Sequence, residues 1–359
     1  MEPVLGEITG GENEVVPAGR VAEFLVRVFE SVGTPDFIAR VAAEHLVCAN
    51  LCGCDSHGVI EITDCLNKVK AGVVVPAAMP RIVSRRGAAA VVDAQNGWGL
   101  YAGKYATDLA IEMAMSTGIG GVSVRNCNDI GRLGEYVEKD GERGLIGFVL
   151  RGPGRPAAWR TAVPGLHMAG PYGGSIKTLG TNSIAVGVPN GDDVPLVAEF
   201  RTPVYQDRGQ PSPPEVLLDE QELSATSPAE YVGACALPIF VKRKGYGFSL
   251  LTCLLGCLTG SYEFHTGDME GPFFVVIDPG AFWSREGFQA GIRSFLGGMK
   301  ATPLGARNGG ARVLRDIEAP SRAHREVEGI ELTPVVQATL RAAAEDCGVP
   351  FDLFPDILA

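Results

Sequence analysis

The sequence predicts a mixed α/β fold, in which amphipathic helices alternate with short buried strands. Long apolar runs with helical periodicity, such as 36–51 and 100–116, are separated by short apolar runs typical of strands, such as 273–278. The chain also holds 47 glycines and 24 prolines, which is high for an all-helical protein and indicates many turns. A length of 359 residues is sufficient for roughly two domains.

The elements follow in order along the chain. Residues 1–17 are acidic and rich in Gly and Pro, so we expect a flexible leader, and the polar, proline-rich stretch 203–230 is expected to be an exposed excursion. The expected helices are 21–29, 36–51, 59–71, 100–116, 133–141, 248–258, 284–296 and 335–346. The expected strands are 88–93, 122–124, 145–150, 195–200 and 273–278.

Charge and composition exclude several classes of protein. The net charge of −11 argues against nucleic acids and anionic membranes as partners, because both bind basic surfaces. No apolar signal segment opens the chain, and its longest apolar run, 248–258, is too short to span a bilayer. Nine cysteines without paired Cys-x-x-Cys spacing indicate free thiols and no metal site, although Cys48, Cys52 and Cys54 lie close together. We therefore expect a soluble cytoplasmic protein.

The first candidate site is the segment Asp-Ser-His-Gly-Val at 55–59. If a helix runs from Val59 onward, His57, Glu61 and Cys65 share one face, because residues four apart lie above one another. A carboxylate one turn from an imidazole biases its charge and tautomer, which suits acid–base chemistry. The alternative is a simple helix N-terminus capped by Asp55 or Ser56.

Several further motifs occur in a fixed order. No Gly-x-Gly-x-x-Gly follows a strand, which argues against an ordinary Rossmann domain. The motifs are Asp-Ser-His-Gly-Val at 55–59, Val-Val-Asp at 91–93 with Asn96-Gly97, Gly-Ile-Gly-Gly-Val-Ser-Val at 118–124, Gly-Leu-Ile-Gly at 144–147, Gly-Thr-Asn at 180–182, and Lys-Gly-Tyr-Gly at 244–247 with Leu-Leu-Gly-Cys-Leu-Thr-Gly at 254–260. Together they resemble the type-2 malate/L-lactate dehydrogenase family, which includes ureidoglycolate and sulfolactate dehydrogenases and cyclic ketimine reductases.

The resemblance covers most of residues 20–345 and implies a specific architecture. It implies a non-Rossmann NAD(P)-binding domain on a mainly antiparallel sheet, at 77–283, and a helical domain built from both chain ends, 18–76 with 284–359. It also implies a homodimer, a small-molecule substrate, and NAD or NADP as cofactor, with NADPH favoured for a reductive role.

The residues that match the cofactor side of the family are largely present. Lys244 matches the nucleotide-contacting lysine, and its charge suits a phosphate, while Gly245 permits close backbone approach. The remaining positions expected to contact the cofactor are Gly180, Thr181 and Asn182, where Ser183 replaces the family's proline, and the strand end at Glu199 and Phe200.

The residues that match the chemical side are replaced. Asp129 stands where the family's acid–base histidine is expected, Glu61 stands where its substrate-carboxylate arginine is expected, and Cys65 replaces a tyrosine. Of the usual polar set only His57 remains. Like charges about 4 Å apart repel by roughly 4 kcal/mol at an effective dielectric near 20, so Glu61 disfavours a 2-oxo acid bound in the family's pose.

These replacements favour a cationic or neutral substrate, such as an imine or ketimine, over a 2-oxo acid. We expect His57, Glu61 and Asp129 to face that substrate, with Asp129 moving protons if burial or Glu61 raises its pKa. Nearby Arg125, Arg132 or Arg151 could supply a substitute clamp for a carboxylate. A non-redox enzyme in the same pocket and a cofactor-binding pseudoenzyme remain alternatives. Two further residues have open interpretations. Cys127 is either a nucleophile or a buried thiol, and His45 is expected to be a core histidine.

Overall fold

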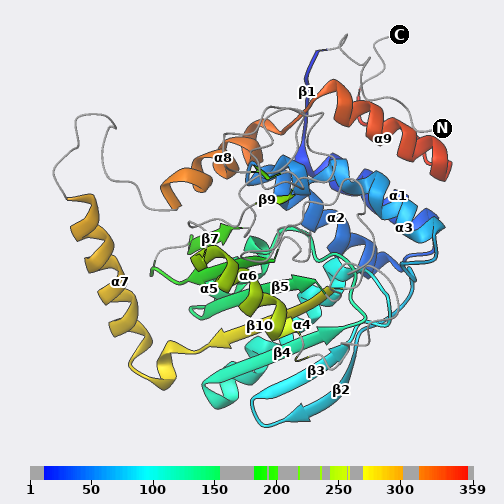
Figure 1. Ribbon diagram of the computed structural model, residues 1–359. Coiled ribbons are helices and arrows are strands. Elements are labelled where there is room, and N and C mark those ends of the chain that lie inside the picture. Colours follow the sequence, from blue (N-terminus) through cyan, green and yellow to red (C-terminus); the bar gives the residue numbers. More distant parts are fainter. Residues whose placement is uncertain are drawn as a thin grey trace.

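The centre of the fold is a seven-stranded sheet in the order β2-β3-β4-β10-β5-β6-β7 (Figure 1). The computed structural model describes residues 12–153, 182–191, 194–200, 217–218, 235–236, 243–256, 258, 270–301 and 315–354. The strands are β2 (Arg81–Arg86), β3 (Ala89–Asp93), β4 (Ile119–Arg125), β10 (Glu270–Ile277), β5 (Ile146–Pro153), β6 (Ser183–Val188) and β7 (Leu196–Phe200). Only the β3–β4 pair is parallel; every other neighbouring pair is antiparallel, which confirms the predicted mixed α/β fold on a mainly antiparallel sheet.

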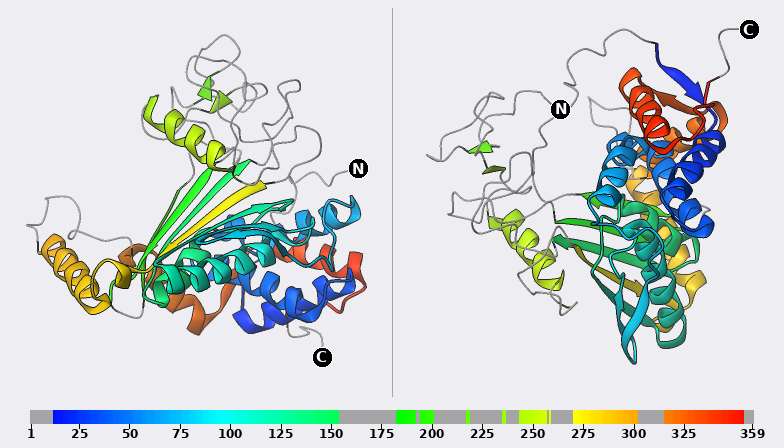
Figure 2. Two further views of the ribbon diagram at one scale, coloured as in Figure 1. Left: turned by 90° about the horizontal axis from the view of Figure 1, so that it is seen from below. Right: turned by 90° about the vertical axis from the view of Figure 1, so that its right-hand side faces the viewer.

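Helices cover both faces of this sheet. Helices α4 (Gly99–Thr117) and α5 (Gly134–Glu142) lie on one face and α6 (Arg243–Gly256) on the other, as the left view of Figure 2 shows. Side chains of α4 and α5 pack with the apolar residues of β3, β4, β5 and β10 into one core. Gly120 permits the close approach of α4, because a β carbon there would lie 2.2 Å from the Ala110 carbonyl oxygen.

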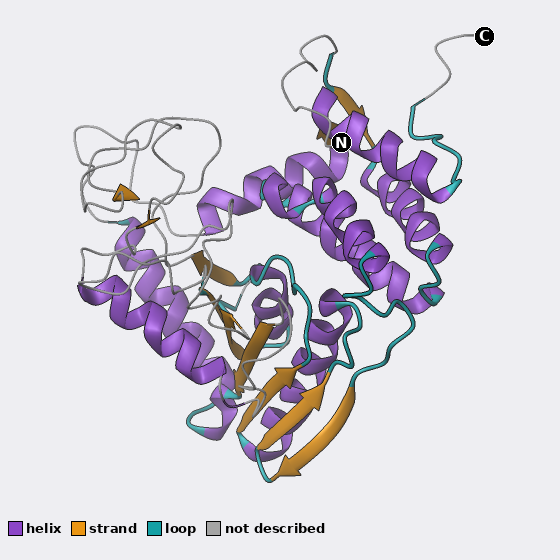
Figure 3. Cartoon of the chain, turned by 45° about the vertical axis from the view of Figure 1, so that its right-hand side comes forward, coloured by secondary structure: helices purple, strands orange, loops and turns teal. Residues whose placement is uncertain are grey.

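Helices from both ends of the chain form a second group (Figure 1), and Figure 3 shows the purple helices beside the orange strands. It contains α1 (Ala18–Ser31), α2 (Asp36–Leu51), α3 (Ile62–Lys70) and α9 (Pro334–Cys347), with the small sheet of β1 (Glu14–Val16) and β11 (Ile330–Leu332). Their apolar faces share a separate core, which extends to Trp98 and Leu100 at the start of α4.

Two helices complete the described chain. Helix α8 (Arg315–Glu328) packs near α2, while α7 (Arg285–Lys300) stands away from the body of the molecule (Figures 1 and 2). No residue of α7 is buried. Among the described residues, no helix is long and apolar enough to cross a membrane.

Most predicted helices and strands are confirmed to within a few residues, and four predictions need correction. Residues 14–16 of the predicted flexible leader pair with β11. Residues 81–86, for which no strand was predicted, form the edge strand β2, with every residue exposed. Helix α8 was missed, because its polar sequence includes Pro320. The helix predicted from residue 59 begins only at Ile62, because residues 55–61 form separate turns. The excursion 203–230 lies outside the described residues except for β8 (Leu217–Leu218), which pairs with β9 (Cys235–Ala236).

Candidate active site

The segment that carries His57 and Glu61 folds into two short 3₁₀ turns before α3 begins. The turns span Asp55–His57 and Val59–Glu61, and Gly58 between them is extended. The Asn50 side chain holds this arrangement, because its Oδ1 accepts the Val59 N–H at 2.8 Å. A β carbon on residue 58 would lie 2.1 Å from that oxygen, so glycine is required here. The predicted continuous helical face through His57 is therefore replaced by a clamped turn.

Asp55 is not the predicted helix cap. Its Oδ1 accepts hydrogen bonds of 2.7 Å from both the Asn50 amide and the Arg325 guanidinium. Ser56 does not cap a helix either, since its Oγ lies 3.0 Å from Nδ1 of His57. Thus α2 and α8 together fix the turn that presents His57, which is half-buried.

Asp129 lies on the loop between β4 and α5, and backbone contacts fix that loop. The Asn128 side chain donates to the carbonyl oxygens of Asn96 and Gly97 at 3.1 and 2.9 Å. The Asp129 Oδ1 accepts the Gly131 N–H at 2.7 Å. Residue 131 has φ +67°, which favours glycine. The turn therefore holds the Asp129 carboxylate in one orientation.

A cation from the sheet pairs with this carboxylate. Nη2 of Arg151, on β5, lies 3.0 Å from Oδ2 of Asp129. Desolvation raises the pKa of Asp129, but the charges of Arg151 and Lys68 and the Gly131 N–H outweigh it and hold that pKa well below its usual range. The Asp129 side chain nevertheless keeps 41% of its surface exposed, against 15% for Arg151. Asp129 is thus a fixed anion that remains accessible.

The pKa of Glu61 is shifted in the opposite direction, upward. Burial is the main reason that its pKa rises to about 7, and the negative charge of Asp129 is the next. The Lys68 and Arg151 charges only partly counter the rise. A carboxyl group with a pKa near neutrality can both give and take a proton at physiological pH, which suits a general acid or base.

These side chains form what we call the Asp129 cluster: His57, Glu61, Lys68, Asp129 and Arg151. The charges of His57, Lys68 and Arg151 each act on Asp129, and those of Lys68, Asp129 and Arg151 act on Glu61, so the five groups lie close together. The structure therefore brings together all three residues predicted to face the substrate.

Lys68 was missed at sequence level. It lies on α3 seven residues after Glu61, which places both on one helical face, and its Nζ is 2.6 Å from Oδ2 of Asp64. Burial lowers the pKa of Lys68, but the charges of Asp129 and Asp64 raise it by more than burial lowers it. The net shift is upward, so Lys68 is a cation. The spacing Glu61, Cys65, Lys68 was the available signal. Cys65 is part of the same face, and burial raises the pKa of its thiol to about 12.

On the predicted cofactor side, Asn182 is the best-defined residue. It is buried, its backbone has φ +40°, and its amide contacts two side chains of α6, donating to Ser249 Oγ and accepting from Cys253 Sγ at 3.3 Å. Ser183, beside it, pairs in register with Arg151, so the Asn182 turn adjoins the Asp129 cluster across the sheet. Gly180 and Thr181 lie outside the described residues, and only the helical backbone is described at Lys244 and Gly245.

Glu199 and Phe200 end strand β7, as expected. The two carboxylate oxygens of Glu199 accept the N–H groups of Leu133 and Gly134 at 3.0 and 2.9 Å, which caps the N-terminus of α5. Phe200 contacts Phe248 of α6, with ring centroids 5.8 Å apart. Glu199 therefore positions α5, and with it the loop that carries Asp129, whatever else it contacts.

The described residues fit a dinucleotide on the α6 side of the sheet. Helix α6 begins at Arg243, and the first turn of a helix offers backbone N–H groups and a positive dipole end, which favour phosphate. A β carbon at Gly247 would meet no atom of the described residues within 4 Å. An open glycine in the first turns of such a helix is consistent with a ligand that approaches the backbone.

Two competing hypotheses are decided by contacts. His45 is a satisfied core histidine, because Nδ1 lies 2.7 Å from Oε2 of Glu135 while Nε2 accepts the Arg132 N–H at 3.0 Å. The Cys127 thiol is fully buried and lies 3.3 Å from the Asn128 carbonyl oxygen, as expected for a buried thiol. Of the predicted substitute clamps, Arg151 lies in the Asp129 cluster, whereas Arg125 pairs with Asp93 and Arg132 lies beside Glu138 and Glu199.

Comparison with known proteins decides the family. The family model described as malate/L-lactate dehydrogenase matches residues 16–341. The chain belongs to this family. It is 31% identical over 311 residues to malate dehydrogenase of Pyrococcus horikoshii, covering 80% of this chain and 82% of that protein. It is 27% identical over 348 residues to hydroxycarboxylate dehydrogenase B of Escherichia coli O157:H7, covering 91% and 92%.

Solved structures of family members have the same fold. The Pyrococcus horikoshii malate dehydrogenase structure superposes with a TM-score of 0.84 at 26% identity, covering 97% of this chain and 99% of that one. The structure of delta1-piperideine-2-carboxylate reductase from Pseudomonas syringae pvar. tomato gives 0.76 at 26% identity, covering 92% and 99%. The malate/L-lactate dehydrogenase family thus consists of NAD(P)-dependent oxidoreductases that include both hydroxycarboxylate dehydrogenases and ketimine reductases, and the sequence-level resemblance is confirmed.

Proposed function

We propose that this protein is an NAD(P)-dependent oxidoreductase that reduces an imine or ketimine, with Glu61 as the proton donor. The observation that carries the proposal is the pairing of a carboxyl group of pKa about 7, Glu61, with a fixed anion, Asp129. The combination places a transferable proton and a negative charge in one site. A cation or a developing cation is the substrate species that such a site stabilises.

The proton balance of imine reduction matches these groups. The nicotinamide cofactor, when bound, supplies the hydride that reaches the imine carbon. Protonated Glu61 gives its proton to the imine nitrogen, the product amine leaves, and Glu61 takes a proton back from solvent. Asp129 keeps its charge throughout, because Arg151 and Lys68 hold its pKa low. Asp129 therefore stabilises the iminium without taking its proton.

The same contacts work against malate- or lactate-type 2-oxo acids. Both cations of the cluster already contact carboxylates, Lys68 with Asp64 at 2.6 Å and Arg151 with Asp129 at 3.0 Å. A substrate carboxylate bound by Arg151 would therefore share that guanidinium with Asp129. His57, within the cluster, is proposed as a further polar contact to the substrate.

The predicted cofactor residues complete the proposal. We assign Asn182 to the surface that binds the dinucleotide. Gly180, Thr181, Lys244 and Gly245 are assigned to the same surface because they match the family's cofactor-contacting positions. Glu199 and Phe200 border it, and Phe200 contacts α6 through Phe248. The charge of Lys244 suits a phosphate near the positive end of α6. The two apolar cores correspond, in this proposal, to the helical domain and the cofactor domain.

We also infer that the protein acts as a homodimer in the cytoplasm. Helix α7 carries Phe288, Ile292, Phe295 and Met299 at helical spacing, yet none of its residues is buried. Trp283 and Phe295 keep 61% and 67% of their surfaces exposed. An apolar helix face that projects from the body is most simply covered by a second copy of the chain.

The proposal is tested by cofactor binding and by turnover. Calorimetric titration with NADH and NADPH should show micromolar binding of at least one of them. The preferred cofactor is then assayed with cyclic imines and with the 2-oxo acids of matching carbon skeleton, following absorbance of the reduced nicotinamide. We expect kcat/KM to be higher for the imines. Binding of neither cofactor, or turnover without net cofactor oxidation, would contradict the redox function.

A further inference from the structure

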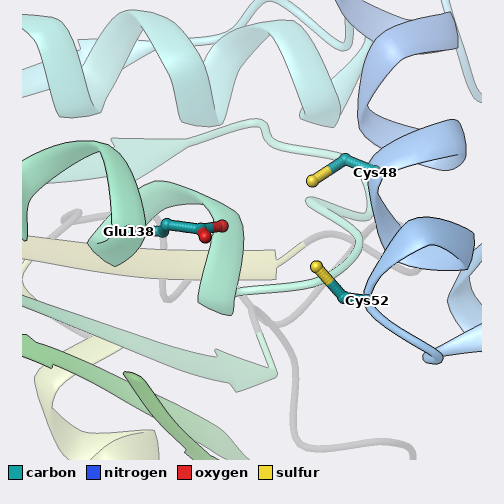
Figure 4. A group of neighbouring side chains, drawn as sticks. All are labelled: Cys48, Cys52 and Glu138. Carbon is teal, nitrogen blue, oxygen red and sulfur yellow. The ribbon is translucent and has the colours of Figure 1, made fainter. Parts of the chain in front are cut away.

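We propose a thiolate site for a soft divalent metal ion such as Zn²⁺, formed by Cys48, Cys52 and Glu138. Cys48 and Cys52 lie one turn apart at the C-terminal end of α2, and Glu138 faces them from α5 (Figure 4). One potential ligand atom from each residue lies within 4.8 Å of the other two. The cysteine spacing alone predicted no metal, because the third ligand comes from a distant part of the chain.

The geometry is close to that of a metal site. A tetrahedral zinc ion has bonds of about 2.3 Å to sulfur and about 2.0 Å to oxygen, so its ligand atoms lie roughly 3.5 to 3.8 Å apart. Because the ligand atoms lie within 4.8 Å of one another, they must close by about 1.3 Å at most. Cys52 and Glu138 are buried and Cys48 is half-buried, which leaves the Cys48 side for the ion to enter and for water as a fourth ligand.

The donor set selects the kind of metal. Two thiols and one carboxylate suit Zn²⁺ and Cd²⁺, whereas Mg²⁺ and Ca²⁺ require oxygen donors. Cys48 and Cys52 are free of disulfides, so both thiols are available as ligands. Thiolates are the species that bind metal, so the ion displaces the thiol protons when it binds.

The charges around the site allow one divalent ion to replace two thiol protons. Arg322 contacts one oxygen of Glu138, and Nη1 of Arg132 lies 3.9 Å from the other. Binding of one divalent ion releases the protons of both thiols, so the site exchanges two protons for two positive charges and its net charge is unchanged. Arg322 can remain on Glu138 as an outer contact that orients the carboxylate.

The proposed metal site lies between two parts of the fold. It joins α2, in the helical group, to α5, which follows the loop that carries Asp129. A bound ion would add a bond between the two apolar cores and hold α5, and with it the end of the loop that carries Asp129, against the helical group. Metal binding is therefore expected to stabilise the folded protein by mass action.

The test uses the full-length protein, reduced and freed of metal. Cd²⁺ is added while the ultraviolet sulfur-to-cadmium charge-transfer band is followed, and Zn²⁺ affinity is measured by competition with a chromophoric chelator. We expect one equivalent to bind and the melting temperature to rise. The double variant Cys48→Ser with Cys52→Ser should weaken binding at least about 100-fold, and Glu138→Gln about 10-fold.

Cys347→Ser is the matched control, since Cys347 is a half-buried thiol at the end of α9. It should leave the cadmium band and the zinc affinity unchanged. Circular dichroism of the metal-free variants shows whether they are folded, and the titration of the unaltered protein decides the question independently. No stoichiometric cadmium band in that protein, or a band that persists in the folded double variant, would overturn the proposal.

Discussion

The Asp129 carboxylate and the Arg151 guanidinium lie 3.0 Å apart, on a loop and a sheet strand that only the tertiary fold brings together. The contact keeps Asp129 ionised and leaves Glu61 as the carboxyl group that titrates near neutral pH. From the sequence, we expected Asp129 to move protons if its pKa is raised. Since that pKa is lowered, we propose Glu61 for proton transfer and Asp129 for charge stabilisation.

The substitution Asp129→Asn should move the pH profile of kcat/KM. Burial is the main cause of the raised Glu61 pKa and the Asp129 charge the second, so loss of that charge lowers the pKa below about 7. The limb near pH 7 should shift to lower pH, and the affinity for the cofactor should stay intact. A limb that stays at its original pH in Asp129→Asn would mean that the charge of Asp129 does not act on the titrating group.

Arg151→Met should move the limb of the kcat/KM profile near pH 7 to higher pH, opposite to the shift expected for Asp129→Asn. Arg151 lowers the pKa of Glu61, so Arg151→Met is expected to raise it above about 7. Arg151→Lys keeps the charge and serves as the control, with a limb close to that of the unaltered enzyme. The pH profiles of the three proteins, measured with one imine, check the prediction. A limb that is insensitive to Arg151→Met would place Glu61 outside the rate-determining chemistry.

The exposed apolar face of α7 predicts the assembly state. Phe295→Glu should dissociate the homodimer, because a charge cannot be buried in an apolar interface without a partner. Val327→Glu is the control, since Val327 is 82% exposed on α8 and should not affect assembly. Light scattering after size-exclusion chromatography measures the mass of each protein. A dimer that survives Phe295→Glu would require an interface elsewhere.

The buried carboxyl group of Asp140 predicts how stability depends on pH. Burial raises its pKa to about 8, and its Oδ1 has no hydrogen-bond partner among the described residues. Because the folded state holds this proton up to about pH 8 and the unfolded state loses it near pH 4, the stability that Asp140 contributes is complete below pH 4. It falls by about 1.4 kcal/mol per pH unit until about pH 8.

Asp140→Asn should remove this slope and make the protein more stable than the unaltered chain at pH 8. Urea unfolding at pH 6, 7 and 8 measures the difference in free energy of unfolding. The exposed neighbour Glu142 provides the control Glu142→Gln, which should keep the original slope. Equal slopes for Asp140→Asn and the unaltered protein would mean that Asp140 is ionised in the folded state.

Local patterns were sufficient for most of the fold but not for its turns. Helix α2 was predicted at Asp36–Leu51, because Pro35 and an apolar run mark its limits within the sequence. The turn at 55–59 was not predictable, since its shape depends on the Asn50 amide and on Arg325, which lies 270 residues from Asp55. The edge strand β2 was missed because all of its residues are exposed, so no buried face gave a signal.

The candidate site shows the same limit. His57, Glu61 and Asp129 were identified from motifs, but the protonation state of each carboxyl group depends on neighbours that the motifs do not contain. Lys68 was within reach, being on the face of α3 that follows Glu61. By contrast, Arg151 was one of three possible arginines, and only its contact with Asp129 in the folded structure places it in the cluster. The pairing of Cys48 and Cys52 with Glu138 likewise requires the packing of α2 near α5.

The measurement that tests the proposed chemistry most directly is the pH profile of imine reduction by the unaltered enzyme and by Glu61→Gln. Glu61 loses activity as it deprotonates, so kcat/KM of the unaltered enzyme should fall above about pH 7. Glu61→Gln should lower kcat by roughly 10²- to 10⁴-fold and remove that limb. The exposed carboxylate Glu44 on α2 gives the control Glu44→Gln, with an unchanged profile. A Glu61→Gln enzyme that keeps both its rate and its limb near pH 7 would contradict the proposed role of Glu61.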